Sequence, residues 1–369
     1  MLDAFADAER HSDRGAGIAR RTGRLYMLSQ LLLSKAYAHF LTCRITTALE
    51  LADEAAAIAR ALGSGELLGF TLAVRALVLQ QARPPGDPAV LAAAEEAAAA
   101  VEGTGRSWWS TLSRSLLAFA ALGAGDPHRA RDVLLDAGGG KDLPLLQPSL
   151  RPEYLELLVA SALAVGEVEE AEHWAERALK EAERLGPATR RAAALRALGQ
   201  VEAGSGHQAE AARAFAEAAR ESARAGATLR EAQSLLLGAP LMKAGGDGAR
   251  ATGMWRRGRR LAEQGGALLL VALVDRTGPA VHGHGDATGP AEVPAGKLSL
   301  LTAREREIAH LVAEGLTNQA VASRLCLSPR TVESHVARVY RKTGVPSRAA
   351  LATLLARHAG TARKAPPLP

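Results

Sequence analysis

The sequence predicts an all-α protein in which an array of helical repeats is followed by a small helical domain at the C-terminus. A period of 40 residues recurs along the body of the chain, and helix start and stop signals are dense between residues 301 and 343. No alternating apolar pattern of the kind typical of a β-strand occurs. Aromatic residues make up only 4% of the chain, so the helices are expected to pack largely through alanine.

The repeat period is marked by a glycine and by an alanine five residues after it. The clearest copies begin at Gly166 with Ala171, at Gly206 with Ala211 and at Gly246 with Ala251. Each is predicted to continue as a helix that ends near a glycine, and a second helix then leads to the next copy. The first helices end near Gly186, Gly226 and Gly265, and the second helices cover residues 188–203 and 228–244.

Looser copies precede these three. Gly86 and Gly125 each begin a Gly-Asp-Pro triplet, and residues 44–62 are similar to a further repeat helix, so residues 24–275 are predicted to hold five or six helical pairs. One pair cannot bury its apolar face alone, so neighbouring pairs should stack into a superhelix with one continuous core. Such arrays expose a concave surface for a peptide, a protein or a small ligand. The array resembles tetratricopeptide-type repeats, with longer helices.

Aromatic residues of the array fall into two groups. The first consists of candidate ligand contacts on the concave surface, for which packing is the competing interpretation: Tyr37, Trp108, Trp109 and Tyr154. The second occurs within one residue of the same place in each repeat and is predicted to fill gaps between helices: Trp174, Phe215 and Trp255.

Three further segments differ from the array in composition. Residues 1–23 are weakly patterned, and Gly15 and Gly17 are predicted to break any long helix there. Residues 276–298 are rich in glycine and proline and are predicted to form a flexible linker. Residues 361–369 are basic and proline-rich, which indicates a disordered tail. The C-terminal domain is therefore expected to cover residues 299–360.

Positive charge is concentrated in that domain. The chain carries 12 basic and 4 acidic residues from Lys297 onward, against 33 basic and 35 acidic residues before it. This distribution indicates a nucleic-acid-binding module attached to a neutral body. No signal peptide or membrane-spanning stretch is evident, so the protein is expected to be cytoplasmic.

Three helices are predicted within residues 301–343. Thr302 and Glu305 have the spacing of a capping box, in which the hydroxyl and the carboxylate each accept from a free backbone N–H. Ile308, Leu311 and Val312 follow as a buried stripe, and Gly315 ends the first helix. The second helix starts at Thr317 and is short. Its predicted apolar face is Ala320, Val321 and Leu325, with Ala322 at the crossing of the helices.

The third helix starts at Ser328 and Pro329, which suit the N-cap and the first helical position. One face carries Val332, Val336 and Val339 and is predicted to be buried. Two helices joined by a short turn are typical of a helix-turn-helix, whose second helix enters the major groove of DNA.

This stretch resembles the DNA-binding domain of the LuxR family of transcriptional regulators. The residues that carry the resemblance are Leu301-Thr302, Arg304-Glu305, Glu314-Gly315-Leu316-Thr317-Asn318, Leu327-Ser328, Thr331-Val332, His335-Val336, Gly344-Val345 and Ser347-Arg348. The resemblance implies a fourth helix from Ser347 to about His358 that can pair with its copy in a homodimer on DNA. Its candidate dimer face consists of Leu351, Leu354 and Leu355.

The expected DNA contacts fall into two groups with different roles, because phosphate contacts position a protein and base contacts specify the sequence. Residues expected mainly at phosphates are Arg330, Thr331, Arg338, Arg341 and Lys342. Residues expected at base edges are Glu333, Ser334 and Ala337, although Glu333 could equally pair with Arg330. His335 either contacts phosphate or packs inside. Thr317 and Asn318, at the start of the second helix, complete the candidate set.

These features favour a sequence-specific transcriptional regulator, and the resemblance implies an activator. The array is similar to that of MalT-type regulators, but the phosphate-binding loop of their ATP-binding module is absent here. No catalytic constellation, cofactor site or metal site is predicted, and Cys43 and Cys326 are not arranged as one. Expected partners are double-stranded DNA, RNA polymerase, and a protein or small-molecule effector on the repeats. The alternative is a helical-repeat adaptor whose C-terminal helices mainly dimerise.

Overall fold

The computed structural model describes residues 3–85, 87–102, 105, 107–277, 301–313, 316, 318–325, 332, 335, 336, 339, 342 and 351. The chain divides into two compact units, Met1–Val281 and His282–Pro369. The regular elements of the described residues are all helices, as the fold class requires. Nearly all of the predicted linker and the whole predicted tail lie outside the described residues. No described helix combines the length and the apolar character needed to span a membrane.

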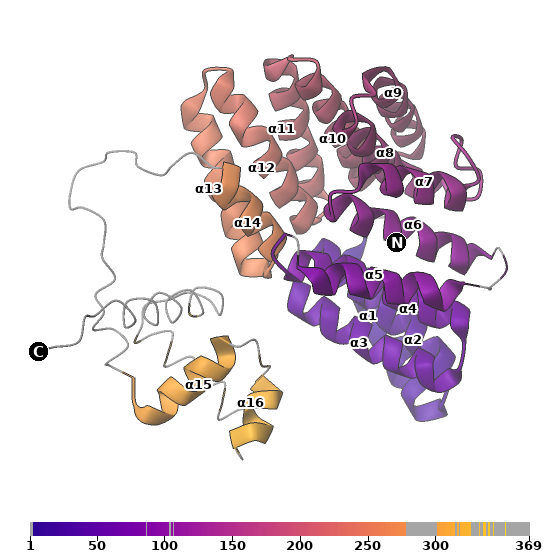
Figure 1. The fold of residues 1–369 in the computed structure, drawn as a ribbon, viewed down its shortest axis with the longest axis vertical. Coiled ribbons are helices and arrows are strands. Elements are labelled where there is room, and N and C mark those ends of the chain that lie inside the picture. Colours follow the sequence, from indigo (N-terminus) through magenta and orange to yellow (C-terminus); the bar gives the residue numbers. More distant parts are fainter. Residues whose placement is uncertain are drawn as a thin grey trace, which may run out of the picture. The chain divides into compact units, whose positions relative to one another are not determined.

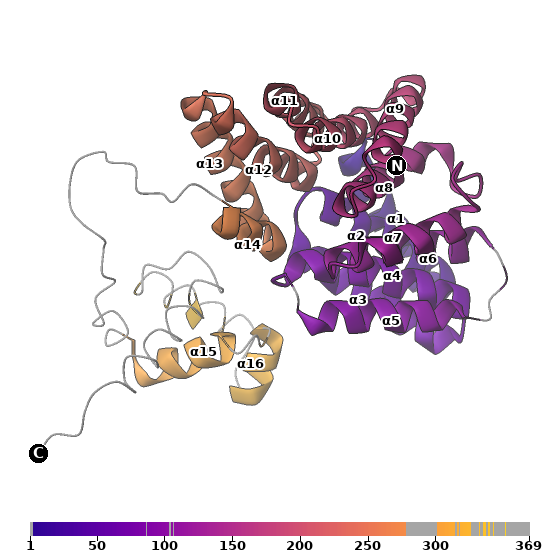
Figure 2. The ribbon, with the colours of Figure 1, turned by 45° about the horizontal axis from the view of Figure 1, so that its top comes forward.

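The N-terminal unit is built from two layers of helices (Figure 1; Figure 2). Each inner helix packs against the outer helix that follows it, and inner helices also contact one another, as α4 contacts α6 and α8 contacts α10. The inner helices are α2 (Leu25–Leu41), α4 (Gly65–Ala82), α6 (Trp108–Gly123), α8 (Arg151–Ala164), α10 (Ala188–Gly204) and α12 (Thr228–Ala244). The outer helices are α3 (Ile45–Leu62), α5 (Pro88–Val101), α7 (Pro127–Gly138), α9 (Val168–Leu185), α11 (Gln208–Arg224) and α13 (Gly248–Gly265). Three elements complete the unit: α1 (Phe5–Thr22), the 3₁₀ turn η1 (Pro148–Leu150) and α14 (Leu268–Thr277).

The two layers differ in how much of each helix is covered. Outer helices such as α9 bury one stripe, formed there by Ala171, Trp174, Ala175, Ala178 and Ala182. Inner helices are covered on more sides: α8 buries an unbroken run from Pro152 to Val159. A helix that is apolar on one face suits an outer position, and one buried all round suits the interior.

The predicted repeat helices are confirmed, and the turn glycines have a conformational reason. Gly166, Gly206 and Gly246 have φ of 83°, 85° and 92°, a left-handed region that residues with a Cβ rarely adopt. Each lies in the turn between an inner helix and the next outer helix. The alanines five residues later, Ala171, Ala211 and Ala251, are at most 4% exposed, so they lie where helices approach closely.

Phe215 confirms that an aromatic residue at this repeat position fills a gap between helices. Its side chain is 2% exposed. A Cβ placed on Gly199 of α10 would lie 2.9 Å from its ring, and one on Gly238 of α12 would lie 2.8 Å from its Cβ. The two glycines therefore make room for the phenylalanine between neighbouring inner helices. Trp174, within one residue of the equivalent place in its repeat, is fully buried.

The prediction that Gly15 and Gly17 break a long helix is wrong. Helix α1 runs through both glycines from Phe5 to Thr22 and ends at Gly23, which has φ of 67°. Gly15 instead serves packing, because a Cβ there would lie 2.9 Å from the side chain of Leu31 on α2. Tertiary contact between α1 and α2 compensates for the low helix propensity of glycine.

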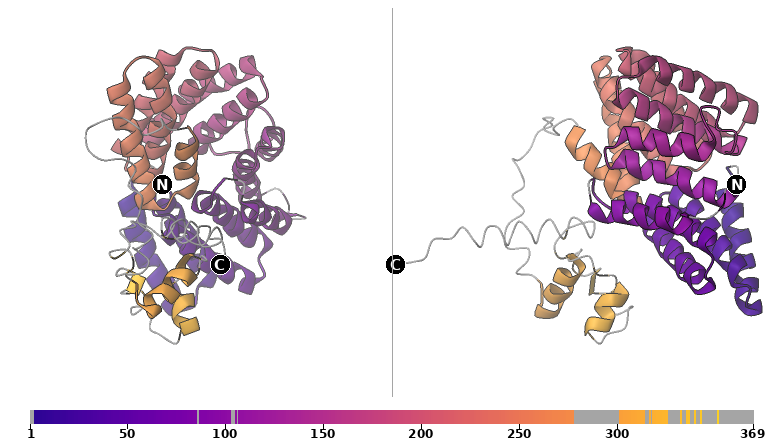
Figure 3. Two further views of the ribbon diagram at one scale, coloured as in Figure 1. Left: turned by 60° about the vertical axis from the view of Figure 1, so that its left-hand side comes forward. Right: turned by 45° about the vertical axis from the view of Figure 1, so that its right-hand side comes forward.

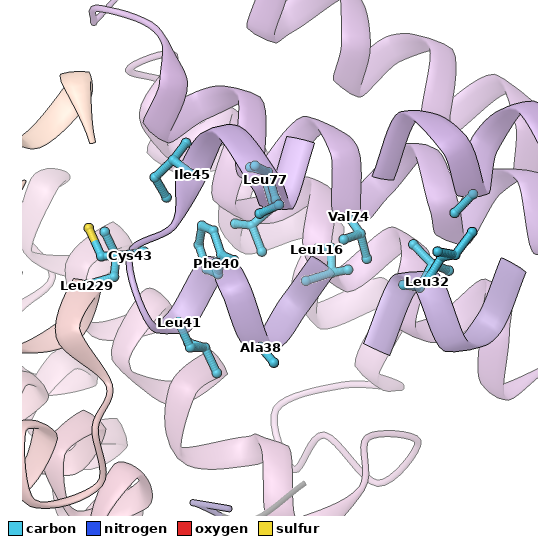
Figure 4. Close-up of a cluster of buried hydrophobic side chains, with 14 of the residues drawn as sticks. Leu32, Ala38, Phe40, Leu41, Cys43, Ile45, Val74, Leu77, Leu116 and Leu229 are labelled. Carbon is cyan, nitrogen blue, oxygen red and sulfur yellow. The ribbon is translucent and has the colours of Figure 1, made fainter. Parts of the chain in front are cut away.

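The array closes on itself, so that its last helices contact its first. Helix α12 contacts α2, and α14 contacts α4, which brings orange and indigo segments together in Figure 3. One buried cluster contains Cys43 and Ile45 from the first repeat together with Leu229 and Ala262 from the last; Figure 4 shows Cys43 beside Leu229. Gly265 adjoins Cys43 so closely that a Cβ on this glycine would overlap the carbonyl oxygen and Sγ of Cys43. We call this contact the closing seam.

Buried polar contacts cross the interior of the closed array. The Tyr37 hydroxyl on α2 donates to Glu153 on α8 at 3.3 Å, and Arg190 on α10 donates to the same carboxylate at 2.6 Å. Burial acts to raise the pKa of Glu153, but the guanidinium groups of Arg190 and Arg230 outweigh it and hold the pKa below its usual value. Tyr154 is 3% exposed. These side chains occupy part of the surface that the sequence led us to expect as an open concave face, and for Tyr154 packing is the correct interpretation.

Candidate nucleic-acid interface

The first helix of the C-terminal unit begins with the predicted capping box. Helix α15 (Ala303–Ala313) follows Thr302, whose backbone N–H donates to Glu305 Oε2 at 2.9 Å. The backbone N–H of Glu305 donates to Thr302 Oγ1 at 3.2 Å in return. Two N–H groups without a helical partner are thereby satisfied, which fixes where the helix starts.

The predicted apolar faces of the three helices meet in one core. Ile308 and Val312 from α15, Val321 and Ala322 from α16 (Asn318–Leu325) and the three valines of the third helix are all buried. Val332, Val336 and Val339 are 0%, 8% and 0% exposed. Residues 332, 335, 336, 339 and 342 are helical. Burial of the valines fixes the rotation of this helix about its own axis.

Two contacts join the ends of these helices. The Arg304 guanidinium donates to the backbone carbonyl of Leu325 at 2.8 Å and so caps the last turn of α16. Lys342 on the third helix donates to Glu305 Oε2 at 2.6 Å, and the Glu305 side chain is only 4% exposed. The Lys342 ammonium has the largest effect on the pKa of Glu305, and the backbone N–H of Thr302 has the next largest. Together they lower this pKa to about 2. One carboxylate therefore caps the first helix and holds the third.

This ion pair is a contact of Lys342 that the sequence did not predict. The sequence led us to expect a phosphate contact, whereas the structure places its ammonium on Glu305, with the side chain 34% exposed. Sequence reasoning treated Arg304 and Glu305 as parts of a motif and did not foresee either contact. The sequence did contain a signal for the Lys342 contact, because a capping-box carboxylate is a negative charge in a fixed position, and a lysine near it is stabilised.

His335 is half-buried, and its Nδ1 is buried without a hydrogen-bond partner among the described residues. Asn318 is the first residue of α16. Leu351 is fully buried in the core of its own unit, so it does not belong to an exposed dimer face. The other candidate residues lie outside the described residues: Thr317, Arg330, Thr331, Glu333, Ser334, Ala337, Arg338, Arg341, Leu354 and Leu355.

Comparison with known proteins agrees with this geometry. The profile for "Bacterial regulatory proteins, luxR family" matches residues 299–355. The C-terminal unit carries a LuxR-type helix-turn-helix domain. The LuxR-type match covers the capping box, the buried valines and the Lys342–Glu305 pair, so these features belong to the helix-turn-helix itself.

Similar proteins are described as regulators. A protein of Mycobacterium tuberculosis described as an HTH-type transcriptional regulator, Rv0890c, is 46% identical over 69 residues, which are 19% of this chain and 8% of that protein. The transcriptional regulatory protein NarL of the same species is 47% identical over 51 residues, 14% of this chain and 24% of NarL. The nitrate/nitrite response regulator NarP of Escherichia coli is 40% identical over 62 residues, 17% of this chain and 29% of NarP.

The chain matches less than a third of the length of each of these relatives. Among solved structures, BtubC from P. vanneervenii covers 78% of this chain at 15% identity with a TM-score of 0.36. This likeness is too weak to support any statement about the fold or function of the array. Within the described residues, no group of three or more His, Cys, Asp and Glu side chains could hold a metal ion.

Proposed function

We propose that the chain is a sequence-specific DNA-binding transcriptional regulator that acts as a homodimer on DNA and activates transcription. Its LuxR-type third helix enters the major groove, and its helical array receives the regulatory input. The support for DNA binding is the LuxR-type match together with the concentration of positive charge after Lys297.

The observation that carries the proposal is the burial of Val332, Val336 and Val339. At 100° per residue, a helix that buries these three positions assigns the opposite side to Arg330, Ser334, Ala337 and Arg341. Arginine suits phosphates there, and small residues allow base edges to approach. We propose that Lys342 holds Glu305, with which its ammonium pairs, rather than a phosphate.

The array is proposed to bind a protein partner, such as RNA polymerase, or a small-molecule effector. Because Tyr37 and Arg190 both donate hydrogen bonds to Glu153 across its interior, an effector cannot use these groups without breaking those bonds. We propose that the input acts either on the outer layer or by opening the closing seam.

Selection of bound duplexes from a random pool by the full chain, at about 0.15 M salt, tests the proposal. Enrichment of a motif with two related half-sites is expected. Ala337→Glu should abolish that binding in a folded protein, because the carboxylate would face the groove floor. A folded wild-type chain that binds no duplex refutes the regulator and leaves the adaptor function. Normal binding by A337E refutes the orientation of the third helix.

A further inference from the structure

The last outer helix of the array differs from the others in charge. Helix α13 contains five arginines and one glutamate, although the chain before Lys297 carries nearly equal numbers of basic and acidic residues. Four of the arginines are exposed: Arg250, Arg256, Arg257 and Arg260. The excess of positive charge on α13 is therefore presented to solvent.

These arginines lie on one face of the helix. The opposite face is buried through Ala251, Met254, Gly258 and Ala262. Arg256 and Arg260 are one turn apart, and Arg250 and Arg257 are two turns apart, so their side chains form a strip about 15 Å long at 1.5 Å per residue. Gly253 lies on the same side of the helix, and nothing lies within 4 Å of a Cβ added to it. The backbone at this position is therefore not covered by a side chain. We call this surface the α13 arginine face.

Neighbouring helix α11 shows that arginine alone does not make such a face. Its three arginines each pair with a glutamate three residues earlier: Arg213 with Glu210, Arg220 with Glu217 and Arg224 with Glu221. On α13, Arg257 pairs with Glu231 at 2.5 Å and Arg259 with Glu263 at 2.8 Å. Arg250, Arg256 and Arg260 form no ion pair with any carboxylate in the part of the chain that the structure describes.

Exposed guanidinium groups that lack carboxylate partners suit an external anion, and their spacing suits a polyanion. A strip of about 15 Å matches four to five base-pair steps of B-DNA at 3.4 Å each, and guanidinium groups bind phosphates bidentately. We propose that the α13 arginine face contacts the phosphodiester backbone of DNA that flanks the site read by the LuxR-type domain. This inference rests on the proposed function and adds a second, sequence-independent contact to it.

The sequence predicts a flexible linker between the units, and such a linker would permit this contact. Residues 278–302 separate α14 from α15. A glycine-rich chain of that length has an average end-to-end distance of about 25–30 Å. DNA bound to the LuxR-type domain is therefore held within reach of the array at high effective concentration, which a free acidic partner lacks.

Two double variants of the full chain test the proposal by equilibrium fluorescence anisotropy. R256A/R260A removes two arginines of the α13 arginine face. R213A/R220A removes the same charge from α11, where each arginine has its own glutamate. Each is measured on a selected motif with short flanks and on the same motif with flanks of about 20 base pairs, over a range of salt concentrations. Circular dichroism confirms that both are folded.

For each bound protomer, R256A/R260A is expected to weaken binding to the long duplex by up to about 30-fold at 0.15 M salt and to reduce the salt slope by about 1.8, because two phosphate contacts are lost. R213A/R220A should bind like the wild type, and all three proteins should bind the short duplex equally. Equal behaviour of the two variants on the long duplex overturns the inference while the regulator stands. Binding to anionic phosphatidylserine vesicles is measured as well. If R256A/R260A binds these vesicles more weakly but binds both duplexes like the wild type, the inference is also overturned. A wild type that binds neither duplex overturns both proposals.

Discussion

Substitution of Gly265 by alanine should break the closing seam. Gly265 is the last residue of α13, and an added Cβ would overlap the backbone carbonyl oxygen and the Sγ of Cys43. A backbone carbonyl cannot rotate away as a flexible side chain can. The first and last repeats must therefore separate to admit the methyl group.

The magnitude follows from two opposed terms. Alanine in place of a helical glycine stabilises by about 0.5–1 kcal/mol. Insertion of a methyl group into a filled contact costs about 1–3 kcal/mol, and a rigid neighbour places Gly265 at the upper end. The net loss is about 2 kcal/mol, which lowers the unfolding temperature by about 4–8 °C for a domain of this size.

Gly253 is a matched control in the same helix. Nothing lies within 4 Å of a Cβ there, so Gly253→Ala should raise the free energy of unfolding by about 0.5–1 kcal/mol. The assay is thermal unfolding followed by tryptophan fluorescence, because Trp108, Trp109, Trp174 and Trp255 all lie in the array. If G265A unfolds at the same temperature as G253A or above it, the closing seam does not exist as described.

Three further predictions concern ion pairs and the third helix. Glu156→Ala leaves the Arg196 guanidinium buried without its bidentate partner, so the free energy of unfolding in urea should fall by about 3–5 kcal/mol. Glu210→Ala is the control: it removes a carboxylate from an exposed pair and should change the free energy of unfolding by less than about 0.5 kcal/mol. Because the pKa of Glu305 is lowered to about 2, the contribution of this carboxylate to the free energy of unfolding is present above about pH 4.5 and is lost as the pH falls toward 2. Lys342→Met should raise the pKa of Glu305, measured by NMR, and an unchanged pKa would contradict the ion pair. Arg341→Ala should weaken DNA binding on every sequence and lower the salt slope by about 0.9 for each bound protomer, and an unchanged slope would remove Arg341 from the phosphate contacts.

Much of the fold could be read from the sequence because its signals are local. The glycines at Gly166, Gly206 and Gly246 mark turns that need positive φ, and the helices between them start and end as predicted. The capping box of Thr302 and Glu305 is equally local, since both partners lie within one turn. Periodicity likewise identified the buried valines of the third helix.

What could not be predicted depends on contacts between residues far apart in the chain. Gly15 looks like a helix breaker until Leu31 is placed against it. The curvature of the array, and hence the contact of Cys43 with Gly265, is the sum of small rotations at each pair of helices, which no single repeat encodes. The Lys342–Glu305 pair joins residues 37 positions apart, so no local pattern in the sequence predicts it.

Closure has a consequence for how this protein can change in evolution. A linear array of repeats can gain or lose a unit at little cost, because each unit contacts only its neighbours. Here the last helices complete the buried cluster of the first, through Leu229 and Ala262 beside Cys43 and Ile45. Duplication or deletion of one 40-residue unit would leave both ends without their partner. Sequences that preserve this closure should therefore conserve the number of repeats more strictly than the identity of the residues within them.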